Sequence, residues 1–208
     1  ETRAIAEPSI AVLLPCYNEA IAIGSTVEAF RHALPTARIY VYDNNSSDDT
    51  AEVARRAGAI VGRERAQGKG AVVRRMFADI DADVYVLCDG DDTYDANAAT
   101  QLVERLLADR LDMITGVRKE TDVAAYRPGH RFGNRLLTGL VRWVFNAHVA
   151  DMLSGYRVLS RRFVKSFPTQ TTGFGLETEM TVHGLQLLMP TDEIVTAYKE
   201  RPPNSMSK

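Results

Sequence analysis

The sequence predicts an α/β fold built on one mainly parallel sheet, and two observations lead to this prediction. Short apolar runs typical of buried strands alternate with segments whose apolar residues recur at helical spacing. Polar, motif-like residues follow three of the runs directly. Ligands of open α/β sheets bind beyond the carboxyl ends of the strands, so a nucleotide site is expected at that edge. At 208 residues the chain is long enough for one such domain.

Five strands are predicted in the first half, from short runs rich in apolar, β-branched and aromatic residues. The first run ends at Pro15, and the fourth leads directly into a cluster of carboxylates. The predicted strands are 9–14, 38–42, 59–61, 84–88 and 113–116.

Helices are predicted between these strands. Apolar residues recur every three or four positions ahead of Pro35, which closes the first helix. Polar residues at 46–49 are N-cap candidates for the second helix, and Gly58 is its expected stop. The second helix is predicted to run from a cap within 46–49 through 56, and the other predicted helical ranges are 23–34, 69–80 and 102–107.

The second half is less regular. A polar loop is predicted at 118–130, followed by a helix at 131–146. Beyond these, the pattern predicts a strand at 155–160, a helix at 176–188 and a final strand at 193–198.

Composition narrows the class of protein. A formal net charge of −2 argues against a nucleic-acid binder. Cys16 and Cys88 are too few for a disulfide framework, and their apolar surroundings predict buried, unbonded thiols in a reducing compartment. The chain contains no run of about 18 apolar residues that could span a bilayer. Because it begins at Glu1 and stops after a polar stretch, we expect it to be the soluble part of a longer protein.

Three carboxylates crowd into four residues after the fourth predicted strand, in the sequence Asp89-Gly90-Asp91-Asp92. One interpretation is an acidic turn that caps the next helix. The other is a metal site, because a buried strand keeps the cluster near the sheet. Hard carboxylate oxygens suit Mg²⁺ or Mn²⁺, and such an ion would neutralise a leaving diphosphate. The metal interpretation is favoured.

Four motifs of the first half, in this order and spacing, resemble those of family 2 glycosyltransferases with the GT-A fold. They are Pro15-Cys16-Tyr17-Asn18-Glu19, Asp43-Asn44-Asn45-Ser46-Ser47-Asp48-Asp49-Thr50, Gly68-Lys69-Gly70 and Asp89-Gly90-Asp91.

This resemblance implies a GT-A fold with a mixed, mostly parallel sheet and helices on both faces. It also implies that the first and fourth strands lie side by side, which would bring Cys16 and Cys88 near each other. Asp43 would hydrogen-bond the base of the nucleotide, and Asp89 and Asp91 would bracket its diphosphate and metal. The full set of residues expected to bind the nucleotide sugar is Pro15, Tyr17, Asn18, Glu19, Asp43, Asn45, Lys69, Asp89, Gly90 and Asp91.

The second half resembles polyprenyl-phosphate glycosyltransferases, which include dolichol-phosphate mannose and glucose synthases and bacterial undecaprenyl-phosphate enzymes. The motifs are Gly116-Val117-Arg118, His130-Arg131-Phe132-Gly133-Asn134-Arg135-Leu136-Leu137-Thr138 and Asp151-Met152-Leu153-Ser154-Gly155-Tyr156-Arg157. The resemblance implies one GT-A domain over residues 1–208, with a nucleotide-sugar half at about 8–117 and an acceptor half at about 118–208. Membrane helices would follow the C-terminal end.

A basic, amphipathic segment supports the same subgroup. Arginines gather beside apolar residues between 118 and 145, although the chain as a whole is mildly acidic. Such a segment suits a membrane surface, and the planar guanidinium group suits phosphate recognition. The alternative is a core helix whose arginines are solvated. The residues expected to bind the acceptor phosphate are Arg118, Arg127, Arg131 and Arg135.

A phosphate acceptor changes what catalysis requires, because a phosphate monoester is largely ionised at neutral pH and needs no general base. Asp151, Glu177 and Glu179 are base candidates if the acceptor is a hydroxyl, and Asp151 could equally orient the arginines. His183 is interpreted as a packing or surface residue. The residues expected to act in catalysis are Asp91, Asp151, Arg118 and Arg131.

The predicted function is transfer of a sugar from a UDP- or GDP-linked donor to a polyprenyl phosphate, with Mg²⁺ or Mn²⁺ and inversion at the anomeric carbon. The reaction is expected at the cytoplasmic face of a membrane. Two alternatives stay open: a glycosyltransferase that acts on a hydroxyl of a saccharide or small soluble acceptor, and a nucleotide-sugar-binding module without turnover. The sequence leaves a homo-oligomer possible and predicts no nucleic-acid partner.

Overall fold

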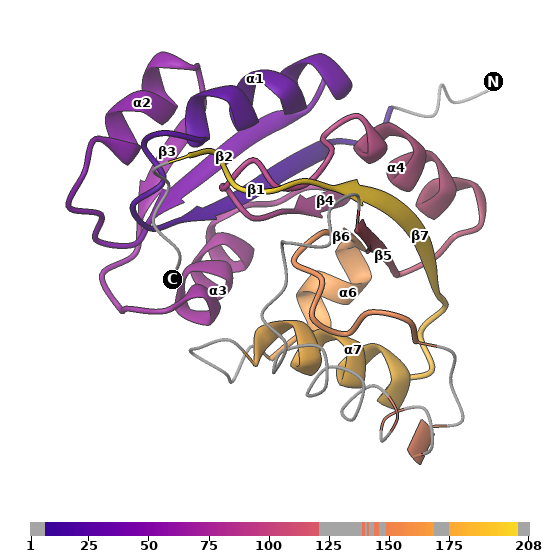
Figure 1. Cartoon of the computed structure of the whole chain (residues 1–208). Coiled ribbons are helices and arrows are strands. Elements are labelled where there is room, and N and C mark those ends of the chain that lie inside the picture. The colour runs from indigo at the N-terminus through magenta and orange to yellow at the C-terminus, as the bar shows by residue number, and fades with distance from the viewer. Residues whose placement is uncertain are drawn as a thin grey trace, which may run out of the picture.

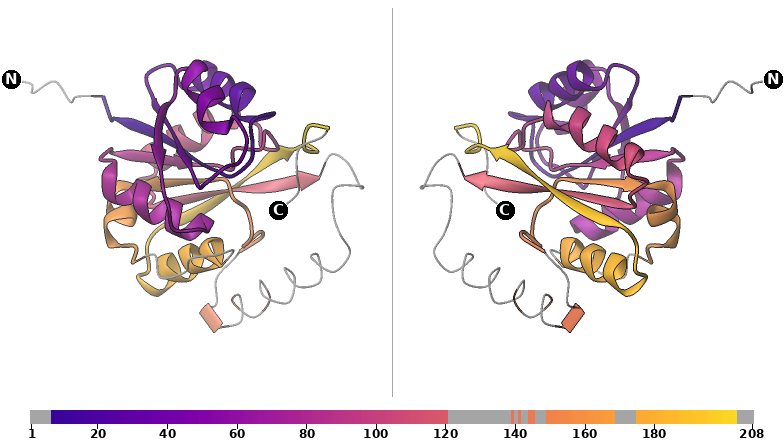
Figure 2. Two further views of the ribbon diagram at one scale, coloured as in Figure 1. Left: turned by 90° about the vertical axis from the view of Figure 1, so that its left-hand side faces the viewer. Right: turned by 90° about the vertical axis from the view of Figure 1, so that its right-hand side faces the viewer.

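The computed structural model describes residues 7–120, 139, 141, 144–145, 149–168 and 175–203. Within these residues one sheet of seven strands runs through the molecule, with helices on both of its faces (Figure 1). The side views show the same layers, with α1 and α2 above the sheet and α7 below it (Figure 2). The predicted α/β class with helices on both faces is confirmed.

The strands occur in the spatial order β3-β2-β1-β4-β6-β5-β7. β6 is antiparallel to β4 and β5, and the other pairings are parallel, as expected for a mixed, mostly parallel sheet. The bounds are β1 Ile10–Cys16, β2 Arg38–Asp43, β3 Ile60–Arg63, β4 Val84–Leu87, β5 Met113–Glu120, β6 Arg157–Ser160 and β7 Thr191–Tyr198.

The helices divide between the two faces. Apolar residues of α1, α2 and α4 belong to one core cluster, and those of α3, α6 and α7 belong to another. Among the described residues, no helix has the length and apolar character needed to cross a membrane. The bounds are α1 Ile23–Ala33, α2 Thr50–Arg56, α3 Lys69–Asp79, α4 Ala98–Ala108, α6 Arg161–Ser166 and α7 Leu176–Gln186.

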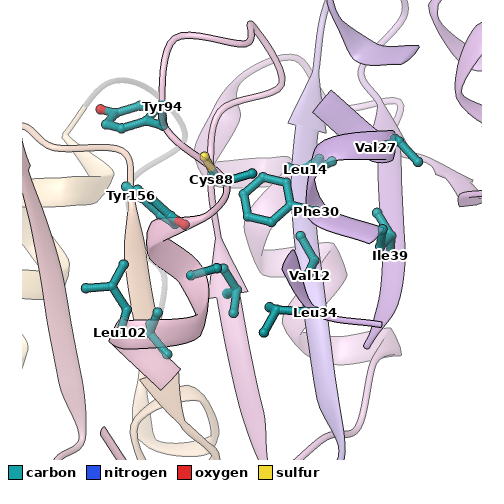
Figure 3. Packing of buried hydrophobic residues seen from close by; sticks show 14 of the residues in the cluster. Val12, Leu14, Val27, Phe30, Leu34, Ile39, Cys88, Tyr94, Leu102 and Tyr156 are labelled. Carbon is teal, nitrogen blue, oxygen red and sulfur yellow. The ribbon is translucent and has the colours of Figure 1, made fainter. Parts of the chain in front are cut away.

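The central strand β1 explains why the first apolar run of the sequence is continuous. Val12 and Leu14 pack into the cluster beneath α1, α2 and α4, part of which is drawn in Figure 3, whereas Ala11 and Leu13 pack into the opposite one. A strand buried on both faces has no solvent side on which polar residues would be favoured. The first and fourth strands pair as expected, and Cys16 and Cys88 are buried in one cluster without a disulfide between them.

The predicted start of the loop at 118–130 was wrong, because residues 118–120 belong to a strand. β5 continues through Arg118 to Glu120 because β7 pairs with it along its whole length, from Met113 opposite Thr191 to Glu120 opposite Tyr198. The rest of that loop lies outside the described residues. Of the predicted helix at 131–146, residues 139, 141, 144 and 145 are described, and they are helical.

The structure confirms the predicted ends of the second helix and adds one short helix that was not predicted. α2 begins at Thr50, and its N-cap Asp49 is one of the predicted candidates; the Asp48 side chain accepts a hydrogen bond from the Thr50 backbone N–H. Gly58, with φ +87°, does follow the helix as predicted. The short helix α6 was not predicted; Ser160 caps it by accepting a hydrogen bond from Phe163 N at 3.0 Å.

Candidate active site

The three polar motifs of the first half meet at one edge of the sheet, because they follow β1, β2 and β4, which are neighbours. Hydrogen bonds join the first two loops. Asn18 N donates to Ser46 Oγ at 2.9 Å, and Asn18 Oδ1 accepts from Ser47 N at 2.8 Å. Asn18 is held with φ 55°, a left-handed conformation that asparagine tolerates better than most residues. The edge predicted to hold the nucleotide is therefore a preformed set of linked loops.

Residues of the second loop brace the chain that leads to α3. The Asn44 side chain donates to the carbonyls of Glu64 and Ala66 and accepts from Gly68 N at 2.8 Å. Asn45, one of the predicted nucleotide residues, donates to Arg65 O at 2.9 Å. The bracing role of Asn44 was not predicted, although it lies within the quoted motif.

Pro15 and Asp43 lie at the ends of two neighbouring strands and are buried, whereas Tyr17 in the next loop is half-buried. The Asp43 carboxylate accepts two long hydrogen bonds of 3.3 Å from Ser46 N. These three residues therefore line the same edge of the sheet as the loops described above.

Lys69, the first residue of α3, lies between two carboxylates. Its Nζ is 2.5 Å from Asp89 Oδ1 and 2.6 Å from Glu177 Oε1, and Glu177 is in the first turn of α7. Burial opposes the charge on Lys69, but the two carboxylates outweigh burial and raise the pKa of its ammonium group. The three residues form an ionic triad that connects the edge predicted to bind the donor (the donor edge) to the second half of the chain. Glu177, considered above only as a base, is therefore a neighbour of the predicted donor residues Lys69 and Asp89.

Two glycines permit this close packing. The Asp89 carboxylate and Lys69 Nζ lie against the position that a Cβ atom of Gly155 would occupy, with Nζ 3.1 Å from it. The sulfur of Cys16 lies against the corresponding position at Gly90. A glycine is required at each position because a side chain there would displace a strand end or a carboxylate.

Asp91, the central carboxylate of the predicted metal site, is buried. Its Oδ1 accepts from Thr93 Oγ1 at 2.6 Å, and its Oδ2 lies 2.6 Å from Nη2 of Arg201. Arg201 Nη1 is also 3.7 Å from Glu19 Oε1, so one guanidinium group bridges the loops after β1 and β4. Sequence reasoning missed Arg201, because nothing near it in the sequence marks it as part of a site.

The segment that carries Arg201 lies along the acidic loop. Tyr198, at the end of β7, forms an antiparallel bridge with Tyr94, and Lys199 N donates to Thr93 O at 2.9 Å. Lys199 Nζ then pairs with Asp92 Oδ2 at 2.9 Å. In Figure 1 this yellow segment passes from β7 across the ends of the neighbouring strands. Two cations of the C-terminal segment thus face two carboxylates of the acidic loop.

A divalent metal ion is compatible with these residues. In the part of the chain that the structure describes, no three His, Cys, Asp or Glu side chains form a ready-made metal cage. The Asp89 and Asp91 carboxylates both already face cationic side chains. Hard oxygen ligands of this kind suit Mg²⁺ or Mn²⁺, which commonly take one or two carboxylates and obtain further ligands from substrate phosphates.

The predicted acceptor residues are described in part. Arg118, in β5, donates from Nε and Nη2 to the two oxygens of Asp151 at 2.7 and 2.9 Å, and its guanidinium carbon lies 5.6 Å from the ring centroid of Tyr198. Because both Asp151 oxygens accept from Arg118, the geometry favours an orienting role for this carboxylate. Arg127, Arg131 and Arg135 lie outside the described residues.

Tyr94 lies between the predicted donor and acceptor residues, since its phenol is influenced by the charges of both Asp89 and Arg118. Burial raises the pKa of its phenol, the charge of Asp89 raises it further, and the nearby cations Arg118 and Lys69 oppose this rise. The Tyr94 hydroxyl accepts from Gly155 N at 2.8 Å. His183 lies elsewhere, against the rings of Phe163 and Phe167 at 5.4 and 5.3 Å, in agreement with a packing role.

The sheet order, with one antiparallel strand and an acidic loop after β4, is that of GT-A glycosyltransferases. The family described as Glycosyl transferase family 2 matches residues 11–167, and the chain belongs to this family. The predicted family, fold and enzyme class are thereby confirmed.

Several known proteins are similar to the chain. Protein RfbJ of Shigella flexneri is 53% identical over 124 residues, which are 59% of this chain and 96% of that protein. Glycosyltransferase AglJ of Haloferax volcanii is 34% identical over 203 residues, 95% of this chain but only 65% of AglJ. A dolichyl-phosphate hexose transferase of the same organism is 28% identical over 192 residues, 92% of this chain and 83% of that protein.

A solved structure shares the fold. Glucosyl-3-phosphoglycerate synthase from Mycobacterium tuberculosis, in complex with Mn²⁺, UDP and glucosyl-3-phosphoglycerate, superposes with a TM-score of 0.77. It is 24% identical, and the match covers 95% of this chain and 74% of that one.

Proposed function

We propose that the chain transfers a sugar from a nucleotide diphosphate sugar to the phosphate of a polyprenyl phosphate, with inversion at the anomeric carbon. The observation that carries this proposal is the Arg118–Asp151 pair beside the donor edge. The Arg118 side chain is 13% exposed, and Asp151 fixes the plane of its guanidinium group through two hydrogen bonds. A preoriented guanidinium next to Tyr94 suits an acceptor phosphate at the donor site.

The donor would lie along the linked loops after β1, β2 and β4. Asp43 would contact the base, and Pro15, Tyr17 and Glu19 would line the nucleoside pocket. Asp91 and Asp89 would hold a divalent metal, Mg²⁺ or Mn²⁺, which when bound supplies positive charge to the diphosphate as it leaves. A UDP- or GDP-linked sugar fits this assignment, and the UDP and Mn²⁺ of the similar mycobacterial structure support a uridine donor.

The chemistry needs no general base. One oxygen of the ionised acceptor phosphate would attack the anomeric carbon while the bond from that carbon to the donor diphosphate breaks. A sugar phosphodiester forms and a nucleoside diphosphate leaves, so atoms and charges balance without proton transfer. Arg118, with Arg131 and its neighbours in the basic segment, would orient the acceptor phosphate. Asp151 would orient Arg118.

The acceptor class is supported by the similar dolichyl-phosphate hexose transferase, and the basic segment suggests that the reaction takes place at the cytoplasmic face of a membrane. A soluble acceptor is the second candidate. The similar mycobacterial synthase is named for a phosphoglycerate product. In addition, Lys69 pairs with both Asp89 and Glu177, so Glu177 is near the proposed donor diphosphate and could serve as the base for an acceptor hydroxyl.

Product partitioning separates the two candidates. The purified chain would be incubated with UDP- and GDP-sugars, Mn²⁺ or Mg²⁺, and either undecaprenyl phosphate in detergent or soluble acceptors such as a free saccharide and phosphoglycerate. We expect a sugar-labelled product that extracts into organic solvent and appears only with the lipid phosphate. Labelled product only in water would overturn the proposal in favour of a hydroxyl acceptor, and donor binding without any turnover would favour a binding module.

A further inference from the structure

Arg157, the first residue of β6, is fully buried, yet the proposed function gives it no part. Its guanidinium group donates to Met152 O at 2.9 Å and to Ser154 O at 3.3 Å. It also donates to Thr181 Oγ1 at 3.0 Å and contacts Met113 Sδ at 3.1 Å. All four of these acceptors are uncharged. Removing a cation from water costs several kcal/mol even after relaxation, and burial accordingly lowers the pKa of Arg157. Structural packing alone would not need a charged residue here.

The groups that Arg157 holds belong to the parts of the chain that carry the site. Met152 and Ser154 form the turn between Asp151, the partner of Arg118, and Gly155, which lies against Asp89. The third acceptor, Thr181, is on α7, the helix whose first turn carries Glu177. One guanidinium group therefore ties the turn at 151–155 to α7.

We propose that Arg157 is a positioning residue for transfer. By fixing the turn at 151–155 against α7, it sets the Arg118–Asp151 pair at a constant distance from the ionic triad of Lys69, Asp89 and Glu177. Donor and acceptor groups that react must be aligned to within a fraction of an ångström, so a small displacement of this turn lowers the rate without unfolding the chain. This inference depends on the proposed function in one respect only, which is the identity of the acceptor.

The test compares Arg157→Lys and Arg157→Met with Tyr156→Phe. Lysine keeps the charge but has one nitrogen, which cannot reach both carbonyls and Thr181 in the geometry of the guanidinium. Tyr156 is an equally buried neighbour whose hydroxyl has no hydrogen-bond partner among the described residues, so its phenylalanine variant is a control for disturbance of the core. We expect kcat to fall about tenfold or more in both Arg157 variants, and to stay within about twofold in the control.

A double-mutant cycle separates positioning from stability. If Arg157 acts through Asp151, then Arg157→Lys in a chain that already contains Asp151→Asn should lower kcat much less than it does alone. Losses that multiply independently, or a kcat that is restored fully by lysine, would overturn the proposal. If the Arg157 variants do not fold, Thr181→Val removes the link from Arg157 to α7, together with the hydrogen bond from Thr181 Oγ1 to Glu177 O, and should show the same non-additivity with Asp151→Asn.

The same samples keep this test independent of the acceptor assignment. Release of nucleoside diphosphate is measured with the lipid phosphate, with a soluble acceptor and with water alone, and thermal unfolding and donor calorimetry are recorded for each variant. If the lipid phosphate is not used, the cycle is evaluated with whichever acceptor is turned over. A fall in kcat that is matched by a loss of folded protein would contradict the positioning role.

Discussion

Replacing Arg201 with glutamine is expected to strengthen the binding of Mn²⁺ in the absence of nucleotide. The guanidinium group lies 2.6 Å from Asp91 Oδ2, and a metal ion that takes this oxygen has to displace it. In the wild-type chain, the free energy of metal binding is therefore reduced by the free energy of the Arg201–Asp91 pair. Glutamine retains most of the side-chain length and removes the competing charge.

The expected magnitude follows from the exposure of the two partners. A hydrogen bond to a charged group contributes about 1.5–3 kcal/mol. The Asp91 side chain is 5% exposed, but that of Arg201 is 30% exposed, so solvent screening places the pair near the lower end of this range. About 1.4 kcal/mol corresponds to a tenfold change in a binding constant. The Kd for Mn²⁺ is thus expected to fall about tenfold in Arg201→Gln.

The assay is a titration with Mn²⁺ in which the electron paramagnetic resonance signal of the unbound ion is measured. Arg105→Gln is the matched control, because Arg105 is also ion-paired but with the exposed carboxylates of Asp109, which follows α4, and of Asp192 in β7. Its Kd should not change. In metal-free buffer Arg201→Gln should unfold at a lower temperature than the wild-type chain, since the buried Asp91 loses its partner. Added Mn²⁺ should remove this difference in unfolding temperature. An unchanged or higher Kd for Mn²⁺ in Arg201→Gln would refute the reasoning, as would an equal gain in a chain that also carries Asp91→Asn.

Three further substitutions test other parts of the site. Asp91→Ala should abolish metal-dependent binding of the nucleotide sugar in calorimetry while circular dichroism stays native, and unchanged turnover would contradict the metal assignment. Arg118→Ala should lower kcat/KM for the lipid phosphate about tenfold or more, since one charge-assisted contact is lost, with donor affinity nearly constant; an equal loss of donor affinity would rule out an acceptor site. Gly155→Ala should destabilise the chain by about 1–3 kcal/mol and weaken donor binding, because the new methyl group displaces the Asp89 carboxylate; wild-type values in chemical denaturation and calorimetry would contradict the close contact.

Much of the first half could be predicted from the sequence, for a local reason. Strands such as β1 and β4 are buried on both faces, so their residues are apolar without interruption and a short window reveals them. The acidic loop follows β4 immediately, and its place at the edge of the sheet follows from the parallel pairing of β1 with β2 and β4. The fold class, and the edge of the sheet at which the motifs meet, were determined by patterns within about ten residues.

The tertiary structure alone decided how the two halves meet. β5 extends past Gly116 with polar residues, because β7 supplies a partner for each of them, and no local pattern encodes that partner. Lys69 and Glu177 are 108 residues apart in the sequence but share a hydrogen bond. Arg201 reaches Asp91 only because β7 ends beside the acidic loop. Ionic contacts of this kind depend on the path of the chain between the partners, whereas a sequence pattern records only neighbours along the chain.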